Sequence, residues 1–96
     1  MNDFRNMKPG ESWTLDWDGE SVVVSAETEF VFWVSKYVDG AAWKVAKLTH
    51  APDADPEHPW IVEPTGPRYD EESYSSWGSA LRAAAGMKVE TGDYLD

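Results

Sequence analysis

The chain has 96 residues, enough for one domain with a single hydrophobic core. Its 18 acidic residues outnumber 8 Lys and Arg, and the net charge of −10 disfavours direct binding to duplex nucleic acid, which needs clustered basic side chains. The absence of cysteine excludes disulfides, thiolate metal sites and a Cys nucleophile. No apolar run has the length of a membrane span or of a signal peptide. We therefore expect a cytoplasmic protein without membrane contact.

Aromatic residues are unusually common in so short a chain. Six Trp, four Tyr and three Phe make up 14% of it. Each buried ring removes about 150–250 Å² from water, so a few rings suffice for a core of this size. We expect some of the others at a surface, where aromatic side chains mark interfaces.

The first half of the chain predicts an antiparallel meander. Alternation places Trp13, Leu15 and Trp17 on one side of a half-buried strand. The dipeptides Asp18-Gly19 and Asp39-Gly40 are typical of tight hairpin turns. The predicted strands are 13–17, 21–26, 30–38 and 43–48.

The second half predicts loops, one short strand and one helix. The segment 49–59 holds three prolines and cannot continue a central strand. A short strand is expected over 60–63, followed by a loop over 64–72. Over 76–85, Trp77, Leu81 and Ala84 recur with helical spacing. Ser75 or Ser76 can cap the start of this helix, and Gly86 fits the position after its end.

These elements predict an α+β fold with two layers: an antiparallel meander sheet of four to five strands, with one C-terminal helix packed on one face. We expect a single domain, 1–96. Its parts are an N-terminal arm (1–11), the sheet (12–63), the helix (75–86) and an acidic tail (87–96) that either adds a sixth edge strand or is disordered. The residues predicted to face the helix are Trp13, Leu15, Val22, Val24, Phe30, Phe32, Val34 and either Trp43 or Leu48.

The other face of the sheet is apolar where water is expected. Val31, Trp33 and Tyr37 share that side of the third strand, and Val23 can widen it. Three explanations stay open. The 50–59 loop or the tail covers the face, two copies pack their sheets face to face, or another protein docks there.

The densest group of ligand-type side chains lies in the proline-rich loop. It consists of His50, Asp53, Asp55, Glu57 and His58. Imidazole and carboxylate groups can hold a metal, but such ligands normally sit on rigid elements with fixed spacing. We expect a solvated acidic loop and no metal.

No catalytic or cofactor motif occurs. The chain has neither a G-x-S-x-G elbow nor a glycine-rich phosphate loop, and Trp77-Gly78-Ser79 lies inside the predicted helix. We therefore expect a protein that is not an enzyme and that has no cofactor. Lys36, Lys44 and Lys47 are the only candidates for a local basic spot on the sheet.

The sequence thus predicts a small acidic protein-interaction module. Its predicted contact residues are Val31, Trp33 and Tyr37 on the sheet and Asp53, Asp55 and Glu57 in the loop. The alternatives are an acidic nucleic-acid mimic, which blocks a nucleic-acid-binding protein through its carboxylates, and a structural homodimer. In size, acidity and a composition typical of GC-rich genomes, the chain resembles small accessory proteins of actinobacterial phages. That resemblance implies a protein that binds and modulates a host protein.

Overall fold

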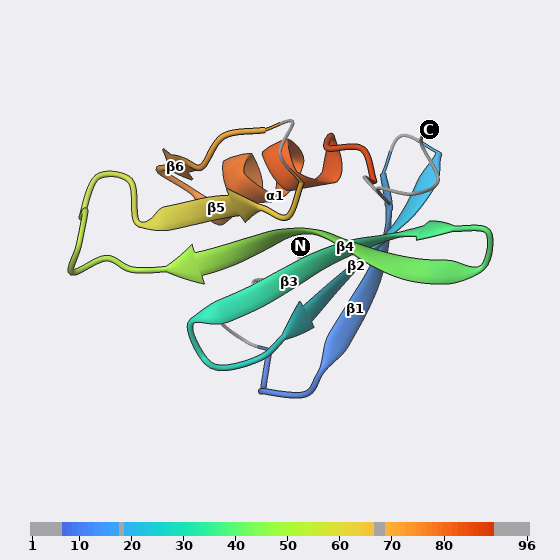
Figure 1. The fold of residues 1–96 in the computed structure, drawn as a ribbon. Helices are drawn as coiled ribbons and strands as arrows, with labels where there is room; N and C mark the ends of the chain where they lie inside the picture. Colours follow the sequence, from blue (N-terminus) through green and yellow to red (C-terminus); the bar gives the residue numbers. More distant parts are fainter. Residues whose placement is uncertain (1–6, 18, 67–68, 90–96) are drawn as a thin grey trace.

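A computed structural model of the chain describes residues 7–17, 19–66 and 69–89 (Figure 1). In chain order the elements are β1 (Ser12–Trp17), β2 (Glu20–Ala26), β3 (Val31–Val38), β4 (Ala41–His50), β5 (Trp60–Pro64), β6 (Glu72–Tyr74) and α1 (Trp77–Ala85). All six strands are antiparallel and lie in the sheet in the order of the sequence. The predicted α+β class, the meander and the C-terminal helix are confirmed, whereas the predicted count of four to five strands is wrong.

The additional strand is β6, which lies partly in the segment predicted as a loop. Its three residues pair with β5, with Trp60 opposite Tyr74 and Ile61 opposite Ser73. A strand of three residues is too short to show alternation, so its pairing with β5 is what defines it. The alternative site for a sixth strand, in the tail, lies outside the described residues from position 90 onward.

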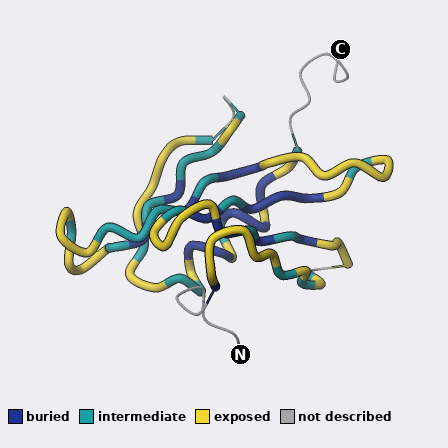
Figure 2. The backbone as a smooth tube through the Cα atoms, turned by 90° about the horizontal axis from the view of Figure 1, so that it is seen from below, coloured by how far each residue is buried: buried dark blue, intermediate teal, exposed yellow. Residues whose placement is uncertain are grey.

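The hydrophobic core lies between α1 and one face of the sheet, and Figure 2 shows the buried positions gathered in the middle of the molecule. The helix packs on β3, β4, β5 and β6. Its N-cap is Ser76, whose hydroxyl accepts a hydrogen bond from the backbone N–H of Ser79 at 3.2 Å. The buried core residues are Met7, Val22, Val24, Ala26, Phe32, Val34, Val45, Ala46, Leu48, Trp60, Val62, Ala80, Leu81, Ala84, Ala85 and Met87.

Phe30 is not part of this core, contrary to the prediction. Its side chain is 55% exposed, and β3 begins only at Val31. The backbone of residues 27–30 forms the turn between β2 and β3, in which the hydroxyl of Thr28 accepts hydrogen bonds from the N–H groups of Phe30 and Val31. Because Phe30 belongs to this turn and not to β3, the inward-outward alternation of the strand does not include it. Trp13 and Leu15 are half-buried and pack against the edge of the core.

A β-bulge in β4 changes which side chains face the helix. Val34 lies opposite Ala46, but Ser35 lies opposite Lys44, so that Val45 is the extra residue. As a consequence Trp43 and Leu48 lie on the same side of the sheet, although their spacing alone predicts opposite sides. Leu48 is fully buried, whereas Trp43 lies beyond the reach of the helix and is 40% exposed.

Candidate interaction surface

The face of the sheet opposite α1 is here called the open face. Residues that lie opposite each other in an antiparallel pair point to the same side, so the strand register assigns the side chains of this face. Its central row runs across five strands, from Ser12 through Ser25, Trp33 and Lys47 to Glu63. Its partly exposed apolar members are Val23, Val31, Trp33 and Ile61. Ile61 was not among the predicted contact residues, although its alternation with the buried Trp60 and Val62 indicates this side.

Trp33 at the centre of the open face is held by two charged neighbours. The ammonium of Lys44 lies 4.3 Å from the centre of a Trp33 ring, and the indole N–H donates to a Glu27 carboxylate oxygen at 3.3 Å. The ring is half-buried. Trp33 therefore presents a fixed, partly covered surface, and a partner that buries it further must also accommodate Lys44.

Beside Trp33, Lys47 and Glu63 form an ion pair of 2.9 Å. The hydrogen bond to Glu63 and the charge of that carboxylate raise the pKa of Lys47, and Glu27 and Glu71 act in the same direction. The predicted basic spot is therefore accompanied by carboxylates. It also lacks Lys36, which the register places on the opposite side of the sheet, level with Val22.

Two of the three exposed aromatic side chains in the described residues lie where the β3–β4 hairpin projects. β2 pairs with β3 only as far as Lys36, and β5 pairs with β4 only from Ala46 onward. Residues 37–43, here called the hairpin tip, therefore continue past the paired parts of both neighbouring strands (Figures 1 and 2). Tyr37 is 51% exposed on one side of the tip, and Trp43 is 40% exposed on the other.

Local chemistry explains the form of the hairpin tip. Asp39 and Gly40 both have positive φ, 52° and 81°, as a two-residue turn that follows the twist of the strands requires. At its base, the carbonyls next to the bulge are bound by Thr65. Its N–H donates to Val45 O at 3.0 Å and its hydroxyl donates to Lys44 O at 2.8 Å. The tip thus projects from a fixed base.

The acidic loop lies at the other end of the molecule. It connects the end of β4 to the start of β5, and both views place it opposite the hairpin tip (Figures 1 and 2). The part of β4 outside the tip, residues 44–50, separates the two by about 23 Å. The predicted contact residues thus form two groups. One side of β3 carries Val31, Trp33 and Tyr37, but Tyr37 is not brought together with the loop residues Asp53, Asp55 and Glu57.

Within this loop, Asp55 organises the backbone. One carboxylate oxygen accepts hydrogen bonds from the N–H groups of Glu57 and His58, each at 3.1 Å. The other lies 3.7 Å from His58 Nδ1, whereas His50 stacks on Trp60 with ring centres 4.3 Å apart. In the described part of the chain, no three His, Asp or Glu side chains are grouped so that they could hold a metal ion.

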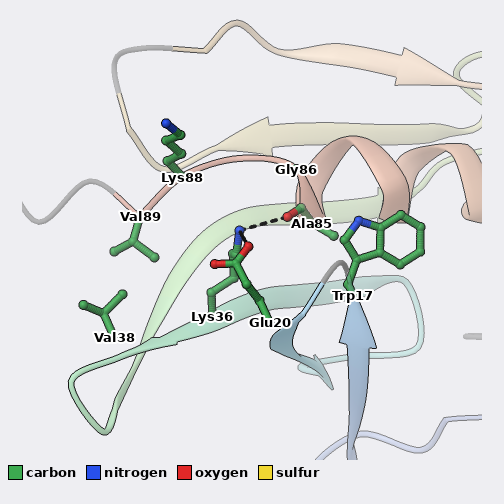
Figure 3. A pocket seen from close by; sticks show the side chains of 8 residues that line it. All are labelled: Trp17, Glu20, Lys36, Val38, Ala85, Gly86, Lys88 and Val89. Carbon is green, nitrogen blue, oxygen red and sulfur yellow. Dashed lines mark hydrogen bonds and ion pairs between the residues drawn. The ribbon is translucent and has the colours of Figure 1, made fainter.

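A second feature is the buried Lys36 (Figure 3), for which the alternation of β3 indicates the side of the sheet but not the burial. It is 5% exposed, and its ammonium donates to the carbonyls of Ala85 at 3.0 Å and Met87 at 3.1 Å. It also pairs with Glu20 at 2.8 Å. These contacts satisfy carbonyls at the C-terminal end of α1 and attach the helix to the middle of the sheet.

A pocket of about 430 Å³ adjoins Lys36, between the β1–β2 turn and the end of the helix (Figure 3). The three N–H donors of the ammonium match its three acceptors. Beside this pocket Lys36 therefore links β3 to Glu20 of β2 and to the end of α1. The residues that line the pocket are Trp17, Glu20, Lys36, Val38, Ala85, Gly86, Lys88 and Val89.

Comparison of the chain with protein-family models, with curated proteins and with solved structures found no match in any of the three. Among the described residues, no helix has the length and apolar character that crossing a bilayer requires.

Proposed function

We propose that this chain is a non-enzymatic protein-interaction module whose main contact element is the hairpin tip, with the adjoining open face as its flank. The observation that carries the proposal is the exposure of Tyr37 and Trp43 where β3 and β4 continue past their pairing with β2 and β5. Tyr and Trp are the residues most enriched among those that dominate binding energy. Here they lie on opposite sides of a two-stranded ribbon, a shape that fits between two walls of a partner's groove.

The geometry of the base supports this role. The turn at Asp39-Gly40, the bulge at Val45 and the bonds from Thr65 hold the ribbon in one conformation. A contact element that is already ordered loses little conformational entropy on binding. The half-buried Val31 and Trp33 continue the same side of β3 that carries Tyr37, so a partner at the tip can extend its contact onto the open face.

The test is affinity capture with matched variants, using nuclease-treated lysate of the source cell. The double variant Tyr37→Ser/Trp43→Ser alters the tip, and Phe30→Ser alters the third exposed aromatic residue, at the other end of β3. We expect a partner that wild type and Phe30→Ser capture at about 0.5 M salt, where screening weakens charge pairs, and that the double variant loses. A partner captured equally by all three proteins would refute the role of the tip.

The same experiment distinguishes the acidic-mimic alternative. A partner of that kind is held by carboxylates, so it should be lost at high salt and in Asp53→Asn/Asp55→Asn/Glu57→Gln. The Tyr37→Ser/Trp43→Ser variant should still capture it. Because the loop and the tip lie at opposite ends of the molecule, the two sets of variants report on separate surfaces.

A further inference from the structure

We infer that the outer edge of β1 pairs with β1 of a second copy of this chain, which would make a continuous sheet across a two-fold axis. This inference concerns a different surface from the hairpin tip and goes beyond the proposed function. It depends on three observations: the backbone groups that β1 directs outward, the side chains that lie along this edge, and the register in which the strand matches itself.

β1 is the first strand of the sheet, and the described part of the chain places no strand on its outer side. The N–H of Ala26 bonds to the carbonyl of Glu11, and the strand register continues from that pair. In an antiparallel ladder, hydrogen-bonded and non-bonded pairs alternate. The main chains of Trp13, Leu15 and Trp17 therefore bond to β2. The N–H and C=O groups of the residues between them point outward, ready to bond to a further strand.

The side chains of β1 give this edge little protection. Its six residues, Ser-Trp-Thr-Leu-Asp-Trp, contain no Pro and no Lys, the residues that commonly block a sheet edge. Trp13, Leu15 and Trp17, here called the edge row, are each only half-buried. The main contacts of the helix are with β3 to β6, so the edge row forms the outer boundary of the core. A further strand with apolar side chains on the same side would cover it.

The strand itself has the required pattern. When a strand pairs antiparallel with a copy of itself, side chains stay on matching sides only if the residue numbers of opposite partners have an even sum. With Leu15 opposite Leu15 of the second copy, Trp13 lies opposite the second copy's Trp17, and Thr14 lies opposite its Asp16. The whole edge row is then paired, and each Asp16 faces a hydroxyl. With the two-fold axis at residue 16 instead of 15, the two Asp16 side chains lie opposite each other. With the axis at residue 14, Trp17 lies opposite Glu11 of the second copy.

Net charge acts against this association. Each chain carries −10, so two copies repel each other at low ionic strength. Salt screens that repulsion while leaving apolar and backbone contacts intact. The pairing should therefore strengthen as salt is raised, which is the opposite of what a basic partner segment on the same edge would show.

The first experiment measures mass by sedimentation or light scattering over a concentration series, with and without about 0.5 M salt. We expect the mass to rise from 10.8 kDa toward twice that value with concentration, and to rise earlier in high salt. Thr14→Glu places a second carboxylate against Asp16 of the other copy, and this occurs twice in each dimer. With about 0.2–1 kcal/mol for each cross-strand pair, the dissociation constant should increase about 2- to 30-fold. Thr14→Lys should decrease it.

Ser73→Glu is the matched control, because Ser73 is exposed on β6 at the other edge of the sheet and receives the same change of charge. A second measurement uses the absence of cysteine. In Leu15→Cys the two introduced thiols lie opposite each other at the axis, so oxidation should link the copies rapidly. Ser73→Cys should link only at the rate of random collision. Circular dichroism establishes that each variant is folded.

Three results would overturn the inference. One is a mass that stays at 10.8 kDa up to about 1 mM, beyond the range of weak specific interfaces, with no preferential linking of Leu15→Cys. Another is a dimer that responds to Tyr37→Ser/Trp43→Ser and not to Thr14→Glu, because it would use the hairpin tip. The last is dimerisation only after residues 1–6 are removed, because the chain's own N-terminus would then be the occupant of the edge.

Discussion

Replacing Lys36 by Met tests whether its ammonium is what attaches the end of α1 to the sheet. Methionine has a similar length but no donor, so the carbonyls of Ala85 and Met87 lose their bonds of 3.0 and 3.1 Å. Both residues are buried, at 1% and 6% exposure. An unsatisfied buried carbonyl costs about 1–3 kcal/mol. The loss of the ion pair with Glu20 adds little to this cost, because the Glu20 side chain is 57% exposed and its carboxylate can bond to water instead.

Two effects reduce the total free-energy cost of leaving the two carbonyls unsatisfied. Water can enter from the adjoining pocket of about 430 Å³ and bond to them, and the folded state no longer has to desolvate an ammonium. We therefore expect Lys36→Met to lower the free energy of unfolding by about 2–4 kcal/mol, a large part of the usual 5–15 kcal/mol. The melting temperature should fall by about 10–30 °C.

The assay is urea unfolding at pH 7, followed by tryptophan fluorescence and far-ultraviolet circular dichroism. Lys47→Met is the matched control, because it removes a lysine from the neighbouring strand whose ion pair with Glu63 is well exposed. We expect a much smaller loss of stability for the control. Unfolding free energies of wild type and Lys36→Met that agree within about 0.5 kcal/mol, the usual range for surface substitutions, would refute the reasoning.

Three further outcomes follow from the packing and from the hydrogen bonds. Phe32→Ala should lower the free energy of unfolding by about 3–5 kcal/mol, whereas Phe30→Ala should change it by less than about 0.5 kcal/mol in the same urea titration. Ser76→Ala removes the N-cap and should cost about 1 kcal/mol by thermal unfolding, with Ser75→Ala, the same change at the exposed preceding residue, as the control. Burial and the hydrogen bond to Glu72 raise the pKa of Tyr74, so folding favours its neutral form. This stabilisation is present at a pH below the ordinary tyrosine pKa of about 10 and is lost as the pH rises through the raised pKa. In an absorbance titration at alkaline pH, Tyr74→Phe should remove the ionisation that occurs last.

Much of the sheet is predictable because its cause is local. The alternation in 13–17 and 21–26 and the two Asp-Gly turns specify antiparallel neighbours from adjacent residues alone. The helix is equally local, since Ser76, the apolar spacing and Gly86 define its start, face and end. The predicted contact residues Val31, Trp33 and Tyr37 share a side of β3 for the same reason, because a strand repeats every two residues.

The candidate site was only partly predictable, since exposure depends on where other strands end. Tyr37 and Trp43 are exposed because β2 and β5 stop pairing before the hairpin tip, and nothing within residues 37–43 encodes those limits. The sequence predicts that Trp33 lies on the open face, but not that Lys44 and Glu27 hold it through contacts across the sheet and across a turn. The contact with Lys44 depends on the bulge at Val45, which places Lys44 opposite Ser35 and so on the open face.

The amino-acid sequence by itself determined the elements of this protein: hairpins from Asp-Gly turns, inward and outward sides from alternation, and one capped helix from the spacing of its apolar residues. The tertiary structure alone decided that Lys36 is buried, that Phe30 is exposed and that Trp43 and Leu48 lie on one side. The physical reason is the range of the forces involved. Turns, caps and alternation act between close neighbours, whereas a buried ammonium needs carbonyl groups some fifty positions away along the chain, 49 for Ala85 and 51 for Met87.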